Sequence, residues 1–209
     1  MPSPPPRPSR RGWLPPVVAL AVAAILAVVL VGGGGSGGDP DPRSTTSTSV
    51  PEPVEISSDS PTYATLGELL AASDLVVRAR VTSTERGRVF GEPGQDTALE
   101  SRLVALEVTE VLRGPEPPPE FLVEEEGWLL DGSPLIVDGL VPSAEGDDAI
   151  WFLVDPSATE PAPFVTVNAQ GRYLVDGDAL RGAEGADPLV TRIEALGAEG
   201  LEEAVRTAG

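Results

Sequence analysis

The chain combines one uninterrupted apolar segment near its start with a longer region in which apolar and polar residues alternate. The apolar segment, residues 13–31, carries no charged side chain. A helix of that length rises roughly 28 Å, which matches the hydrocarbon core of a bilayer. Arg7, Arg10 and Arg11 precede it, and the next basic residue is Arg43. Because cationic flanks stay in the cytoplasm, the pattern predicts one transmembrane helix and an extracytoplasmic remainder.

The same segment also has features of a signal peptide that is removed after export. If the helix begins at Pro15 and Pro16, only about 15 apolar residues remain, a length that suits either a retained anchor or a cleaved signal. The glycines at 32–34 would satisfy a small-residue cleavage rule. We expect a retained single-pass anchor in the cell membrane, with secretion after cleavage as the alternative.

Four further segments follow from composition and pattern. Residues 1–12 are proline-rich and are predicted to form a short cytoplasmic tail. Residues 32–60 contain few large apolar side chains, so they are expected to form a disordered linker of Gly, Ser, Thr and Pro. The remainder is predicted to fold as an extracytoplasmic β domain over 61–185, followed by a C-terminal helix over 186–209.

Within the β domain, the apolar spacing indicates one short helix followed by strands. Thr65 and Glu68 fit a capping box, which predicts a helix over 65–73. Strict alternation then predicts half-buried strands. The run at 147–154 is the most apolar and should be a central strand, with Trp151 and Phe152 in the core. The expected strands cover residues 74–82, 102–111, 121–124, 135–137, 147–154, 164–167 and 172–175.

Two more patterns complete the predicted fold. Residues 168–171, Asn-Ala-Gln-Gly, predict a tight turn that joins the last two strands into a hairpin. Asp187 is a good N-cap, and Pro188 suits the first position of a C-terminal amphipathic helix. Several short strands framed by two helices predict a mainly β fold, either a small antiparallel barrel (OB-like) or a sandwich.

Composition excludes several function classes. The formal net charge is −19, and it is about −22 without the three arginines that precede the apolar segment. Such a surface repels phosphate backbones and anionic headgroups, so nucleic acid is not an expected partner. The chain has no histidine, cysteine or lysine. It therefore lacks a Ser-His-Asp triad, a thiol nucleophile, a His/Cys zinc site, a Schiff-base lysine and a lipoprotein anchor.

Carboxylates are the chemistry that remains. On a strand, Glu124 and Glu126 share one face and Glu125 points away, so the outer two could act as paired acids for glycoside hydrolysis. We interpret the triplet mainly as a solvated rim. Trp128 follows it and, together with Glu124 and Glu126, is a candidate recognition residue. A calcium site is also a candidate, because hard cations bind several oxygens; its four candidate ligands are Asp147, Asp148, Asp176 and Asp178.

Four segments in order carry a resemblance to a known group: residues 73–81, 108–114, 146–153 and 171–175. The chain resembles exported bacterial domains, of actinobacterial type, whose function is uncharacterised. Their architecture is similar to the OB-like barrel of netrin-like and metalloprotease-inhibitor modules. This chain departs from the pattern at Arg78-Ala79, where glycine is usual, and it lacks the cysteines through which the inhibitors engage a metal.

These observations predict a membrane-tethered extracytoplasmic binding module that is not an enzyme. It would contact the membrane through residues 13–31 and bind an envelope protein or glycan, either on the barrel face or at loops 91–100 and 126–148. No cofactor is expected apart from the candidate calcium. Two alternatives stay open, namely a carboxylate-dependent hydrolase of cell-envelope glycan and a structural spacer domain. The ligand and the oligomeric state are left undetermined by the sequence.

Overall fold

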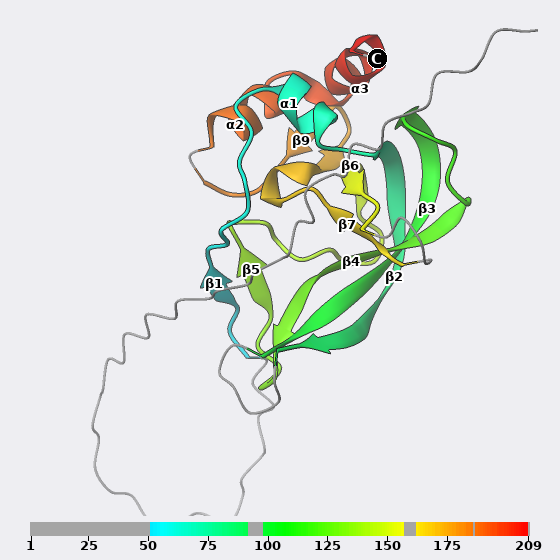
Figure 1. Cartoon of the computed structure of the whole chain (residues 1–209). Helices are drawn as coiled ribbons and strands as arrows, with labels where there is room; N and C mark the ends of the chain where they lie inside the picture. The colour runs from blue at the N-terminus through cyan, green and yellow to red at the C-terminus, as the bar shows by residue number, and fades with distance from the viewer. Residues whose placement is uncertain (1–50, 92–97, 157–161, 186, 209) are drawn as a thin grey trace, which may run out of the picture.

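A computed structural model of the chain describes residues 51–91, 98–156, 162–185 and 187–208 (Figure 1). The predicted tail and membrane segment, and residues 32–50 of the predicted linker, lie outside these residues. Within the described ranges, no helix is long and apolar enough to cross a bilayer.

The described residues form a mainly β fold with helices near both ends, as predicted. The elements in chain order are β1 (Val54–Ile56), α1 (Leu66–Ala71), β2 (Leu75–Phe90), β3 (Leu99–Arg113), β4 (Glu120–Leu129), β5 (Leu135–Val137), β6 (Asp148–Val154), β7 (Phe164–Thr166), η1 (Ala169–Gly171), β8 (Arg172–Asp176), β9 (Ala179–Arg181), α2 (Pro188–Glu194) and α3 (Gly197–Thr207). Strands β2, β3 and β4 extend well beyond the predicted bounds.

Seven strands form one sheet in the order β2-β3-β4-β7-β6-β8-β9, and β2 additionally pairs with β6. The pairings of β2, β3, β4, β7 and β6 therefore close into a circuit. Adjacent strands in it are antiparallel except β4 and β7, which are parallel. Five strands in a closed circuit cannot all alternate in direction, so one parallel pair is required. The sheet is mixed, and the expectation of a purely antiparallel one was wrong.

Alternate residues of the central strands bury into two separate cores. Val77 and Trp151 belong to a core formed by residues of β2, β3, β4 and β6. Val76 and Phe152 belong to a second core, formed with residues of α1, β8, α2 and α3. Trp151 and Phe152 are fully buried. Because β6 is covered on both faces, its continuous apolar run is explained, and the prediction of a central strand is confirmed.

The helices follow their sequence signals closely. Thr65 is the N-cap of α1, and its hydroxyl accepts from the backbone N–H of Glu68 at 3.2 Å. Asp187 caps α2, with Pro188 at its first position. The predicted C-terminal helix is in fact two helices, because Gly197 has a φ of +72°, which interrupts the helical path.

The predicted hairpin between the last two strands is absent. Residues 169–171 form the short helix η1, with Asn168 as its cap. The two strands that it connects pair with β6 one after the other, β7 at Leu153 and Val154 and β8 at residues 149–151. Because β2 occupies the other edge of β6, both lie on the same edge. Both run antiparallel to β6, so the chain keeps its direction through η1 and does not turn back into a hairpin.

The folded region begins earlier than residue 61. Strand β1 lies within the predicted linker and pairs in parallel with β5, about 80 positions later in the chain. After it, the Tyr63 N–H donates to Gln170 Oε1 at 2.8 Å, and Gln170 Nε2 donates to the Tyr63 carbonyl at 3.0 Å. A hollow of about 140 Å³ lies beside these residues. Val54 and Ile56 are half-buried in β1, a local apolar signal that the Ser/Pro-rich composition of the segment concealed.

Candidate functional site

A β-bulge at Gly127 decides where the side chains of β4 point. The register of β3 with β4 shifts between Glu100, which lies opposite Trp128, and Ser101, which lies opposite Glu126. Gly127 is the extra residue, and a Cβ there would lie 2.7 Å from the Glu100 carbonyl oxygen. An extra residue reverses the alternation of faces. Trp128 consequently shares a face with Glu125 rather than with Glu126.

Four buried side chains form an ionic cluster at the loop 138–146 between β5 and β6. They are Arg102, Glu125, Ser143 and Arg172. Arg172 Nη1 donates to Glu125 Oε1 at 2.8 Å. The Ser143 hydroxyl donates to the same oxygen at 2.8 Å. Arg172 also donates to the Ser143 hydroxyl and the Val141 carbonyl. Arg102 Nη1 donates to the Ser143 carbonyl at 2.9 Å. Arg172 is 2% exposed and Glu125 7%, so water screens this cluster very little.

Two tryptophans extend the ionic cluster at its ends. The Arg172 guanidinium lies over the Trp151 ring at 5.4 Å, inside the core. The Arg102 guanidinium lies over the half-buried Trp128 ring at 4.2 Å, and that of Arg86 lies 4.8 Å from the same ring. Cation–aromatic contacts of this kind are favourable, and more so away from water. They orient both arginines and cover the Trp128 ring.

The remaining acids of the triplet have separate surroundings. Glu124 is 7% exposed and accepts a two-pronged hydrogen bond from Arg88, at 3.0 and 2.7 Å. Glu126 reaches solvent. Burial of its surroundings and the charges of Glu125, Asp138 and Glu124 raise the pKa of Glu126. Its exposure limits this effect. The interpretation as a solvated rim was therefore wrong for Glu124 and Glu125, because arginines reach both of them.

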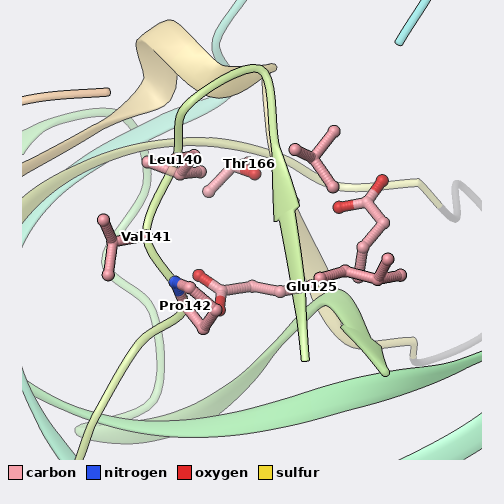
Figure 2. A pocket seen from close by; sticks show the side chains of 8 residues that line it. Glu125, Leu140, Val141, Pro142 and Thr166 are labelled. Carbon is pink, nitrogen blue, oxygen red and sulfur yellow. The ribbon is translucent and has the colours of Figure 1, made fainter. Parts of the chain in front are cut away.

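Figure 2 shows the hollow beside the ionic cluster, with the Glu125 carboxylate next to Pro142. Glu125, Leu140, Val141 and Thr166 contribute to its walls. Its volume is about 20 Å³. That is room for a single water-sized species and far too little for a sugar ring.

Sequence reasoning did not single out Arg102, Ser143 or Arg172. Part of the signal was present. Alternation over the predicted strand 102–111 places Val104 and Leu106 on one face, and the same alternation places Arg102 on that face as well. Val123 and Glu125 are related in the same way on β4. Charged residues in an inward series indicate a buried ion pair, but their partners lie far away in the chain and leave no local pattern.

Three of the four candidate calcium ligands accept hydrogen bonds from elsewhere in the protein. Asp148 accepts from Arg78 at 2.7 Å, and this bond raises the pKa of Arg78. Asp147 accepts from the N–H of Ala144 in a turn. Asp178 accepts from the N–H of Glu199 at 3.1 Å, in the first turn of α3. Asp176 lies at the exposed end of β8. Across the described ranges, no group of three or more Asp or Glu side chains is arranged to hold a metal ion.

Calcium is expected to leave the stability of the protein unchanged. The Asp148 carboxylate already binds an arginine, and the Asp178 carboxylate already binds the first turn of α3. The two carboxylates are therefore not directed at a common cation. We predict that the melting temperature of the full-length protein differs by less than about 1 °C between chelator and millimolar calcium. A rise of several degrees in calcium would show that a site forms and would contradict this prediction.

No model of a known protein family matches the sequence, and no curated protein matches it significantly. The resemblance to exported bacterial domains thus stays a prediction that rests on four short motifs. The function of the chain has to be inferred from the arrangement of its own residues.

Proposed function

We propose that this chain is a membrane-tethered, extracytoplasmic interaction module without catalytic activity. Residues 13–31 supply the tether, and residues 32–50 the spacer. We also propose that the closed circuit of β2, β3, β4, β7 and β6 is a small OB-like barrel. Its interior is the core around Trp151. A barrel of this kind is a rigid scaffold from which an exposed surface can bind a partner.

The proposed binding surface is the arm, defined as residues 82–91, 98–105 and 124–130. These cover the end of β2, the start of β3 and the end of β4, each with one flanking residue. Figure 1 shows these strands curving away from the helices. Two residue rows cross the end of the arm. Val89, Glu100 and Trp128 form one row, and Phe90, Leu99 and Leu129 form the other. The side chains of neighbouring rows point to opposite faces of the sheet, so the arm presents apolar side chains on both of its faces.

The residue types on the arm carry the proposal. Val89 and Leu130 are each 48% exposed, among the most exposed large apolar side chains in the described residues. Beside them, Arg86 and Arg88 are 54% and 69% exposed. Arginine and aromatic residues dominate the binding energy of protein interfaces. Their concentration at one end of a strongly acidic chain favours recognition there.

A protein is the partner that the arm favours over a glycan. A tryptophan that binds sugar needs a free ring face, whereas Arg86 and Arg102 lie over Trp128. In addition, Arg86 pairs with Glu100 and Arg88 with Glu124, so much of the arm's charge is balanced internally. What remains available is apolar surface with a polar rim, which is typical of a protein interface.

One observation favours the rival function, a carboxylate-dependent hydrolase. Glu126 has a raised pKa, whereas its neighbour Glu124 binds Arg88, and unequal surroundings are what an acid and a second carboxylate require. A cleft is also required, and the hollow that Glu126 borders holds about 20 Å³. A sugar ring does not fit there, so we prefer the interaction module.

Two apolar-to-charged substitutions test the arm. Val89→Asp combined with Leu130→Asp places charge on the exposed apolar surface, where neither side chain supports a core. We expect recovery of the envelope partner with the tagged full-length chain to fall at least about tenfold. Quantitative mass spectrometry of proteins that co-purify from membranes of the producing cells measures this.

Leu196→Asp is the matched control, since Leu196 is 46% exposed and lies between α2 and α3, away from the arm. It should leave recovery unchanged. Equal recovery with the arm variant, the control and the unmodified chain would refute the arm as the binding surface. Recovery of glycan fragments that depends on the arm would replace the protein partner with a glycan.

A further inference from the structure

Strand β2 is covered on both edges along only part of its length. Residues 76–80 pair with β3 on one edge and with β6 on the other. The contact on the β6 side ends at Val81, whose N–H donates to the Asp147 carbonyl at 2.8 Å and whose carbonyl accepts from the Gly146 N–H at 2.9 Å. Residues 82–90 continue to pair with β3, but no described strand pairs with their other edge. We refer to residues 82–90 as the open edge.

The open edge presents unpaired backbone groups. In an antiparallel pair, alternate residues direct their N–H and C=O groups toward the neighbouring strand, and the residues between them direct theirs outward. Outside β3, the described residues give the open edge no backbone hydrogen bond. None of its residues is buried. A free edge of this length is a template on which another extended chain can pair.

The open edge also presents positive charge on both faces of the sheet. The Arg86 guanidinium lies over the Trp128 ring, and Arg88 bonds Glu124, whose side chain points to the face opposite Trp128. Arg86 and Arg88 are 54% and 69% exposed, whereas their acidic partners Glu100 and Glu124 are 19% and 7% exposed. A strand that adds here therefore meets guanidinium groups before carboxylates, although the net charge of the chain is −19.

A second copy of the chain is a poor occupant of the open edge. Two copies paired antiparallel about its centre would place Arg86 and Arg88 of each chain beside those of the other. Each copy brings two arginines and a single glutamate, and like charges on opposing strands destabilise a sheet. The register with β3 also shifts between Arg86 and Val89. Charges and bulges are two of the features by which edge strands avoid pairing with themselves.

We propose that the open edge binds an acidic, extended segment of the arm's protein partner, which adds to the arm as a fourth strand beside β2. This inference rests on the proposed function, in which the arm is the binding surface. Backbone hydrogen bonds would hold the segment, and carboxylates beside Arg86 and Arg88 would select its sequence. Because the two arginines lie on opposite faces and side chains alternate along a strand, the segment needs acidic residues on both of its faces.

Synthetic peptides of about ten residues test the proposal on the full-length protein. The acidic probe has glutamate at every third position and valine or threonine elsewhere, so its carboxylates fall on both faces. The basic probe has lysine in place of glutamate. We expect the acidic probe to bind at least about tenfold more tightly, as measured by fluorescence anisotropy. The net charge of −19 by itself favours the basic probe, so the opposite order of affinity would overturn the proposal.

Two further measurements on the unmodified protein test strand addition itself. The acidic probe should slow hydrogen exchange of backbone amides in the open edge and leave residues 76–80 unchanged, because β6 already covers them. The same probe with a methyl group on every backbone nitrogen keeps its carboxylates but cannot donate hydrogen bonds, so it should bind at least about tenfold more weakly. Equal binding of the methylated probe, or exchange that slows only outside the open edge, would refute strand addition.

Arg86→Gln combined with Arg88→Gln tests the role of charge and should weaken binding of the acidic probe at least about tenfold. Arg80→Gln is the matched control, since Arg80 is exposed on the same strand where β6 already pairs with it; it should retain the affinity. Unchanged affinity in the double variant would show that the arginines do not select the segment.

Failure of this proposal is distinguishable from failure of the proposed function. Co-purification with the variant that combines Val89→Asp and Leu130→Asp tests whether the arm binds a partner. The probes test whether the open edge accepts a strand. A partner that is recovered through the arm, together with an acidic probe that does not bind, would refute strand addition and leave the arm as the binding surface.

Discussion

Replacement of Arg172 by methionine should lower the free energy of unfolding by about 3–5 kcal/mol, the usual cost of breaking a buried ion pair from one side. Arg172 is 2% exposed and bonds Glu125 at 2.8 Å. Methionine fills similar space but leaves the Glu125 carboxylate charged in a medium that screens it poorly. The Val141 carbonyl also loses its donor. Urea unfolding of the full-length protein, followed by circular dichroism, measures the loss.

Two further variants separate charge from packing in this experiment. Arg172→Met with Glu125→Met removes both charges of the pair and should recover part of the lost stability, because apolar replacement of a whole buried pair is often neutral. The Val141 carbonyl still lacks its donor, so recovery is incomplete. Arg206→Met is the control, since Arg206 pairs with Glu110 on the surface, and its loss should be much smaller. Equal, small losses for Arg172→Met and Arg206→Met would show that the ionic cluster is not buried as described.

Gly127→Ala should destabilise the protein by about 1–3 kcal/mol, as expected for overpacking against rigid neighbours. The nearest atoms to the new Cβ are backbone atoms, namely the Glu100 carbonyl oxygen at 2.7 Å and the Arg102 nitrogen at 2.9 Å. Backbone in a paired strand cannot move aside as a flexible side chain does. Strands β3 and β4 must therefore separate at the bulge, which also disturbs the contact between Arg102 and Trp128. Denaturant unfolding measures the change in stability.

Gly67→Ala is the matched control for that substitution. Gly67 lies within α1, and a Cβ there would meet only the Thr65 hydroxyl, at 3.9 Å. Alanine is favoured over glycine inside a helix, so this variant should gain roughly 0.5–1 kcal/mol. A Gly127→Ala protein as stable as the parent would mean that the bulge is absent and that Trp128 points with Glu126.

Local patterns predicted most of the strands, because alternation and apolar runs reflect burial directly. The run at 147–154 was identified as central, and β6 is covered on both faces. The cap at Thr65 was also predictable, since its partner Glu68 is three residues away. Pairing was less predictable. The turn-like sequence at 168–171 gave no indication that β7 and β8 continue in the same direction along one edge of β6.

In the candidate site, too, the local alternation was predictable and the contacts between strands were not. Alternation on β4 placed Glu124 and Glu126 on one face, and this holds up to Gly127, where the bulge reverses the faces. A glycine after three glutamates has many explanations in sequence. The structural reason for glycine at position 127 is that β3 approaches so closely that no side chain fits there. The recognition candidate Trp128 therefore belongs with Arg102 and Glu125.

What the sequence by itself determined is the set of local elements, a mainly β fold with helices near both ends, and the absence of histidine, cysteine and lysine chemistry. Short-range spacing and composition are sufficient for these. Only the tertiary structure decided which charges are buried and which side chains meet. Arg172 and Glu125 are 47 positions apart, and β1 pairs with a strand about 80 positions later. Contacts over such separations depend on how the whole sheet closes, which no local pattern records.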